Sequence, residues 1–118
     1  MEASPLLTDL LAGLPIRSEA PLGPAMPHNA HLHLPPNFSA FDTIEQAVGL
    51  AAEQGLVLLC ASNYYDYRIH ERFGRSCIQS GIFPVFGLEI ITFDEALAAH
   101  SIRVNDPNNP GRFYVCGL

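Results

Sequence analysis

The sequence contains no lysine, so its six basic residues are all arginines. It contains twelve acidic residues. The formal net charge is −6 at pH 7, and the arginines are scattered along the chain. Because an acidic surface with few cations is repelled by phosphate backbones, nucleic acid is not expected as a partner. Arg68, Arg72 and Arg75 alone lie close together, with helical spacing, and we interpret them as a solvated helix face.

Cysteine is scarce and long apolar runs are missing. Cys60, Cys77 and Cys116 are widely spaced, so neither a disulfide framework nor a zinc ribbon is predicted. Cys60 and Cys116 lie in apolar runs and are interpreted as buried small residues. No run reaches the length of a membrane span, and the N-terminal segment lacks the basic start of a signal peptide. We therefore expect a cytoplasmic protein with reduced thiols and no membrane partner.

What remains is a chain that is 48% hydrophobic and only 15% charged, which is typical of one globular domain. Residues 1–27 are predicted to form a short helix, capped by Ser4 and ended by Gly13, and then a proline-rich connector. Residues 28–118 are predicted to form the folded domain. A charge-poor chain of 118 residues is long enough for a modest core.

Within this domain, strand-like and helix-like segments alternate. Strands are predicted at 30–34, 56–61, 82–92 and 112–116, and helices at 42–54, from about 68 to 80, and at 94–100. Asp42 and Glu45 have the spacing of a capping box, whereas Gly55 and Gly81 are expected to end helices in the left-handed conformation. The alternation predicts an α/β fold whose strands are parallel and connected by right-handed crossover helices.

The stretch with the clearest chemistry is the pair His31 and His33. Residues two apart on a strand point to the same face, so two imidazoles can reach one metal ion. Glu89 lies inside another apolar strand, where a lone carboxylate is costly unless it is paired or bound to a metal. Since both segments end at the carboxyl edge of the predicted sheet, we expect His31, His33 and Glu89 to form a divalent-metal site. No catalytic residue is assigned.

The order His31-Leu32-His33, capped helix, Gly55-Leu56 before an apolar strand, and Gly87-Leu88-Glu89 resembles the polymerase and histidinol phosphatase (PHP) family. The resemblance covers about residues 29–118. It implies a distorted β/α barrel of which this chain holds the first four strands, incomplete at its C-terminus. It also implies zinc, manganese or iron as cofactor, His31, His33 and Glu89 as ligands, and hydrolysis of a small phosphoester.

Other motif positions differ from the family. The aspartate expected after Ser39 is Ala40, and the second motif, usually Thr-Asp-His-Asp, reads Ser62-Asn63-Tyr64-Tyr65. The resemblance therefore predicts a phosphoesterase domain that is truncated and either weakly active or inactive, with its metal weakly held or absent.

Two alternatives stay open. One is a binding or assembly module that keeps the scaffold without the chemistry. The other is an amidohydrolase-like metal hydrolase, which the absence of the lysine used by that class disfavours. Because four strands cannot close a barrel, self-association through an open edge at residues 112–116 is also expected.

Overall fold

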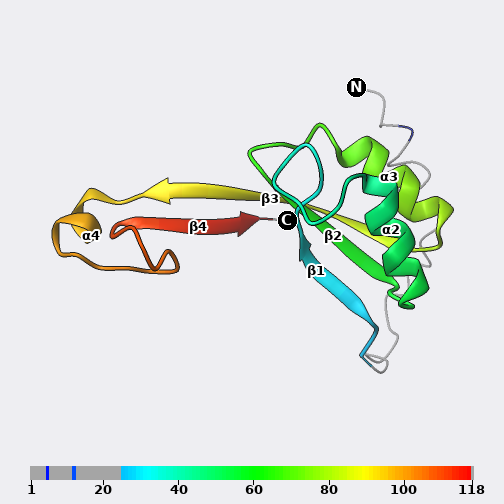
Figure 1. The fold of residues 1–118 in the computed structure, drawn as a ribbon, viewed down its shortest axis with the longest axis horizontal. Coiled ribbons are helices and arrows are strands. Elements are labelled where there is room, and N and C mark those ends of the chain that lie inside the picture. The colour runs from blue at the N-terminus through cyan, green and yellow to red at the C-terminus, as the bar shows by residue number, and fades with distance from the viewer. Residues whose placement is uncertain (1–4, 6–11, 13–24, 118) are drawn as a thin grey trace.

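The computed structural model describes residues 25–117 together with Pro5 and Ala12. The predicted N-terminal helix and connector lie almost wholly outside the described residues. The domain itself is an α/β structure built on one curled, four-stranded mixed sheet, a half-barrel (Figure 1). Among the described residues, no helix is long and apolar enough to cross a membrane.

The sheet order follows the chain order. The strands are β1 (His28–Leu32), β2 (Leu58–Tyr64), β3 (Phe83–Phe93) and β4 (Arg112–Gly117). The first three are parallel, as predicted, and β2 pairs with β3 from Leu58↔Phe83 to Tyr64↔Glu89. The prediction for β2 was too short, because residues 62–64 continue the strand instead of forming a loop.

The prediction of a fourth parallel strand is wrong. β4 pairs antiparallel to β3, from Leu88↔Gly117 to Phe93↔Arg112. Residues 94–111, which connect the two strands, do not cross the sheet: their one helix, α4 (Glu95–Ala99), has five residues and lies at the tip of a long β3–β4 hairpin that projects from the body (Figure 1). Gly111 closes the hairpin with φ 78°, and its carbonyl accepts from the Asp94 amide.

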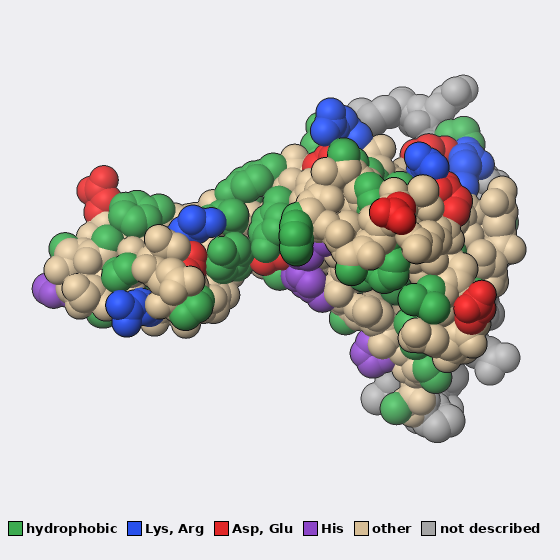
Figure 2. Space-filling model, viewed as in Figure 1, with side chains coloured by type: hydrophobic (Ala, Val, Ile, Leu, Met, Phe, Trp, Pro, Cys, Tyr) green, Lys and Arg blue, Asp and Glu red, His purple; other side chains and the backbone are tan. Residues whose placement is uncertain are grey.

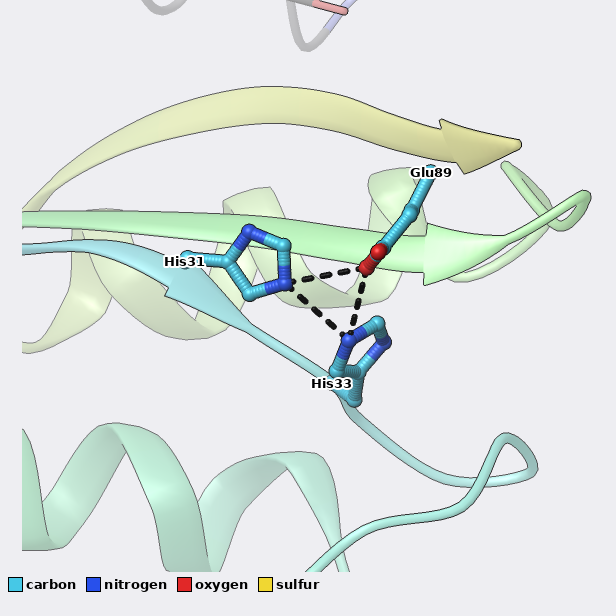
Figure 3. Close-up of side chains that lie close together, drawn as sticks. All are labelled: His31, His33 and Glu89. Carbon is cyan, nitrogen blue, oxygen red and sulfur yellow. Dashed lines mark hydrogen bonds and ion pairs between the residues drawn. The ribbon is translucent and has the colours of Figure 1, made fainter. Parts of the chain in front are cut away.

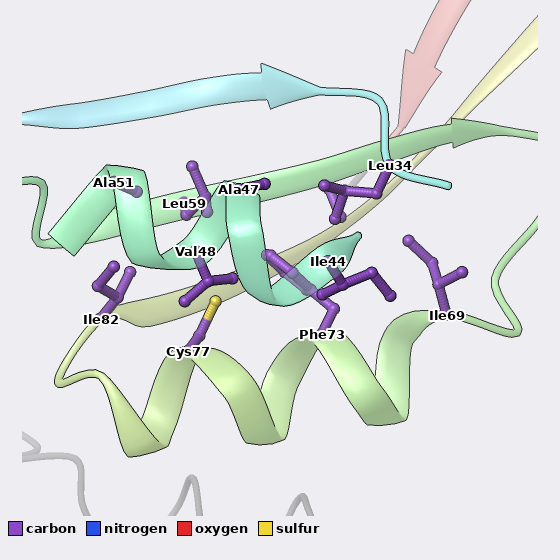
Figure 4. Packing of buried hydrophobic residues seen from close by; sticks show 11 residues of the cluster. Leu34, Ile44, Ala47, Val48, Ala51, Leu59, Ile69, Phe73, Cys77 and Ile82 are labelled. Carbon is purple, nitrogen blue, oxygen red and sulfur yellow. The ribbon is translucent and has the colours of Figure 1, made fainter. Parts of the chain in front are cut away.

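The two longer helices, α2 (Ile44–Glu53) and α3 (His70–Gln79), lie together and bury the core against the sheet (Figure 4). Phe73, Val48 and Cys77 have no exposed surface, and Leu59 on β2 is 1% exposed. The core spans both helices and the start of the sheet, with members Leu34, Ile44, Ala47, Val48, Ala51, Leu59, Ala61, Ile69, Phe73, Cys77 and Ile82.

The helix boundaries test the capping predictions. The cap of α2 is Thr43, not Asp42: the Thr43 side chain accepts from the Gln46 amide, and Gln46 Oε1 accepts from the Asp42 amide. Glu45 instead binds Arg72 on α3 through two 2.7 Å hydrogen bonds. The helix stops are confirmed, since Gly55 and Gly81 have φ values of 72° and 71°.

Four polar side chains each bind both the N–H and the C=O of one backbone residue, as a neighbouring strand would. The pairs are Asn37 with Tyr64, Asn63 with Leu34, Asn105 with Tyr114, and the Tyr65 hydroxyl with Ile91. We call these four side chains the backbone clamps. They provide hydrogen bonds to backbone N–H and C=O groups that the sheet ladder leaves unpaired.

Candidate metal centre

The backbone brings the three predicted ligands to one end of the sheet. β1 ends at Leu32, two residues earlier than expected, so His31 lies on the strand and His33 directly after it. A register irregularity separates Asn29 from Leu32, and the Asn29 side chain accepts from the His31 amide. Glu89 lies on β3 opposite the last residue of β2, so all three residues stand where parallel strands end.

The ligand atoms converge closely (Figure 3). Glu89 Oε2 lies 3.0 Å from His31 Nε2 and 3.0 Å from His33 Nε2, and the two nitrogens are 3.1 Å apart. These are the three residues among those described that could together hold a metal ion through one ligand atom each. The predicted convergence of His31, His33 and Glu89 is therefore confirmed as geometry.

The spacing fits one small divalent cation. Ligand atoms bonded at about 2.0–2.1 Å to one ion lie about 2.9 Å apart at octahedral angles and about 3.3 Å apart at tetrahedral angles. Glu89 is 6% exposed, and its Oε2 has no hydrogen-bond partner among the described residues. A buried carboxylate oxygen that faces neutral imidazole nitrogens without a hydrogen bond is costly, and a cation placed between it and the two imidazoles would remove that cost.

The surroundings fix the His33 ring but leave one of its nitrogens alone. The His33 ring stacks on the Tyr64 ring, with centroids 4.5 Å apart and planes 13° apart. The backbone carbonyl of His33 accepts from the Ser39 hydroxyl. Burial lowers the pKa of His33 despite the opposing effect of Glu89, so the imidazole is neutral at pH 7 and available as a ligand. His33 Nδ1 is buried and has no hydrogen-bond partner in the part of the chain that the structure describes.

The environment of His31 differs, and it includes a residue that sequence reasoning misplaced. Cys116 was expected to be buried, but it is exposed on β4, and its Sγ lies 3.6 Å from His31 Nδ1. It pairs across the strands with Glu89, so both side chains lie on one face of the hairpin. Had β4 been predicted as antiparallel to β3, its register would have placed Cys116 opposite Glu89. The predicted parallel strand gave no reason to place Cys116 there.

At the positions that resemble the second PHP motif, the Asn63 side chain binds the backbone, whereas the Tyr64 ring lies against the candidate ligand His33. Asn63, with no exposed surface, accepts from the Leu34 amide at 2.7 Å and donates to the Leu34 carbonyl at 2.8 Å. Burial and the nearby Glu89 carboxylate raise the pKa of Tyr64, so its phenol stays neutral. Sequence reasoning missed this structural role of Asn63, since the contact spans 29 residues.

The remaining candidates lie elsewhere. His28 is exposed, and its Nδ1 contacts the Met26 carbonyl. His70 at the start of α3 contacts the Gly87 carbonyl, and His100 is exposed beyond α4. The arginines of α3 and the preceding loop pair with acidic side chains, consistent with a solvated face: Arg68 with Asp66, Arg72 with Glu45, and Arg75 with Glu71.

No protein-family model matches this chain, and no curated protein shows significant sequence similarity to it. What bears on its function is therefore the geometry of the triad and the motif residues themselves.

Proposed function

We propose that this chain is a PHP-like metal-binding domain that holds one divalent ion, zinc, manganese or iron, through His31, His33 and Glu89. The observation that supports the proposal is the mutual spacing of 3.0–3.1 Å between three ligand atoms, one of them a buried carboxylate oxygen that has no hydrogen bond within the described residues. In this proposal the half-barrel corresponds to the first strands of the family's distorted barrel, with β4 reversed.

The proposed reaction is slow hydrolysis of a small phosphoester. A divalent ion at such a site polarises a phosphoryl oxygen and lowers the pKa of bound water. The chain contributes two neutral imidazoles and one carboxylate, which leave the ion with net positive charge to attract an anionic substrate. The His31 side chain is 45% exposed, so a ligand can approach from its side of the triad.

The fixed positions of Asn63 and Tyr64 favour a second candidate, a binding module without turnover. In the family these positions supply an aspartate and a histidine, whereas here the first clamps a buried backbone residue and the second stacks on His33. With three ligands, the site holds one ion, and a second ion that would share the phosphoryl charge has no ligands from these residues.

The deciding measurements are metal stoichiometry and hydrolysis. We expect calorimetric titration with zinc to give one ion per chain, with affinity weakened at least about tenfold in His33→Ala or Glu89→Gln, each of which removes a ligand. His28→Ala is the matched control, because it removes an exposed histidine from β1, the strand that carries His31. Failure of zinc, manganese and iron(II) to bind the unmodified chain would refute the proposal.

Hydrolysis separates the two candidates. p-Nitrophenyl phosphate is assayed with added zinc or manganese, beside His33→Ala. Slow turnover that disappears in this variant supports the phosphoesterase, whereas stoichiometric metal without turnover identifies the module.

A further inference from the structure

A recess opens directly beside the triad. Its volume is about 220 Å³, and it is lined by Leu32, the two histidines and the loop residues 38–41. Figure 2 shows hydrophobic side chains next to histidine side chains where the β3–β4 hairpin joins the body. An engineered apolar cavity of about 150 Å³ is enough to hold benzene, so this recess has room for one aromatic ring.

The described residues that line the recess include no carboxylate, lysine or arginine. Ala40 occupies the position of the family's aspartate, which leaves this wall small and uncharged. The Ser39 hydroxyl is already engaged, because it donates to the His33 carbonyl and accepts from the Phe41 amide. The recess is therefore suited to an apolar group, whereas an anionic group would be attracted to the adjacent metal centre.

Phe38 stands out in this lining, because its side chain is 90% exposed. Its loop is nevertheless well held: the Asn37 amide donates to the Leu34 carbonyl, and the Asn37 side chain clamps Tyr64. Because the loop backbone is already held, a ligand that packs on the ring has to order only the Phe38 side chain. The ring therefore offers an exposed aromatic contact surface beside the recess.

We propose that the recess binds the aromatic group of an aryl phosphoester, with Phe38 as the residue that contacts the ring and selects it. This inference rests on the proposed function, since the phosphoryl group would be held at the metal centre formed by His31, His33 and Glu89. The ring would lie between Phe38 and the wall formed by Ala40 and Phe41.

The test uses two stable analogues, phenylphosphonate and methylphosphonate, titrated by calorimetry into the zinc-loaded full chain. We expect phenylphosphonate to bind at least about fivefold more tightly, in line with an aromatic contact. Phe38→Ala should abolish this preference and leave zinc affinity unchanged. Phe93→Ala is the matched control, because it removes another exposed phenylalanine, at the far end of β3.

A second readout comes from fluorescence. The chain contains no tryptophan, so the F38W variant has a single indole whose emission reports on the recess. Phenylphosphonate should shift this emission to shorter wavelength, and methylphosphonate should not. Equal affinities for the two phosphonates, or a preference that survives Phe38→Ala, would overturn the inference while leaving zinc binding intact. Loss of zinc binding in the unmodified chain would instead refute the proposed function, and the inference with it.

Discussion

Replacing Asn63 with aspartate, the residue usual at this position of the PHP motif that the sequence resembles, should destabilise this protein, and the loss should depend on pH. Asn63 is fully buried and binds both backbone groups of Leu34, once as acceptor and once as donor. In Asn63→Asp an ionised carboxylate can still accept from the Leu34 amide but cannot donate to its carbonyl. The folded variant therefore takes up a proton, which restores the donor and avoids a buried charge.

The magnitude follows from linkage. An aspartate has a pKa near 3.9 when unfolded, and each pKa unit corresponds to about 1.36 kcal/mol. Holding the carboxyl neutral thus costs about 4 kcal/mol at pH 7 and about 1 kcal/mol at pH 4.5. The sign is that of a carboxyl whose pKa is raised on folding: the variant approaches the wild type at low pH and loses stability as the pH rises from about 4.

The assay is urea unfolding followed by circular dichroism at pH 4.5 and pH 7, for wild type and variant. Asn105→Asp is the matched control, because Asn105 makes the same two contacts with Tyr114 but is exposed. Water can replace its lost hydrogen bond, so the control should lose less than about 1 kcal/mol and show little pH dependence. A loss in Asn63→Asp that is equal at both pH values would refute the role assigned to the clamp.

Three further outcomes are expected. Gly87→Ala should cost about 1–3 kcal/mol in unfolding free energy, because a Cβ there would lie 2.8 Å from a buried side-chain oxygen; Gly49→Ala, with open space, should not destabilise. Tyr65→Phe removes the hydroxyl that binds both backbone groups of Ile91, so amide exchange at that residue should accelerate, and unchanged exchange would contradict the clamp. Burial lowers the pKa of His33, so the unfolded chain binds a proton at this side chain more readily than the folded chain does. The unfolding free energy of the metal-free protein should therefore decrease as the pH falls below 6.5, and the decrease should be smaller in His33→Ala.

The part of the site that could be predicted from sequence depends on local periodicity. His31 and His33 share a face because strand side chains alternate, and Glu89 is identified by its charge within an apolar strand. Parallel strands place their carboxyl ends at one edge, so three local observations were enough to predict the convergence. The ends of α2 and α3 were equally predictable, since Gly55 and Gly81 supply left-handed conformations.

The direction of β4 could not be predicted, because alternation of helix and strand patterns does not distinguish a crossover from a decorated hairpin. The difference lies in contacts between distant residues. The Asp94 amide binds the Gly111 carbonyl, and the buried Asp106 organises the intervening loop by accepting from Asn108 and Asn109. The position of Cys116 beside His31 depends on that reversal and was missed with it.

The first capping residue illustrates a smaller error of the same kind. Asp42 and Thr43 are both good helix caps, and each is followed three residues later by a side chain able to reach back. The choice of Thr43 leaves Glu45 free to bind Arg72 on α3. A contact between two helices therefore accompanies the one-residue shift, and no local pattern contains that information.

The clamp formed by Asn105 limits how much a second chain could gain by adding a strand to β4. Tyr114 has both backbone groups bound by Asn105, and the Arg112 amide is bound by the Asn109 carbonyl. Since alternate residues of an antiparallel strand turn their backbone groups outward, the described edge residues Arg112, Tyr114 and Cys116 leave the Arg112 carbonyl and both Cys116 groups for a second chain. Three hydrogen bonds at about 1 kcal/mol each fall short of the roughly 4–15 kcal/mol that association costs in lost freedom. Backbone pairing at this edge would therefore need substantial side-chain burial to hold two copies together.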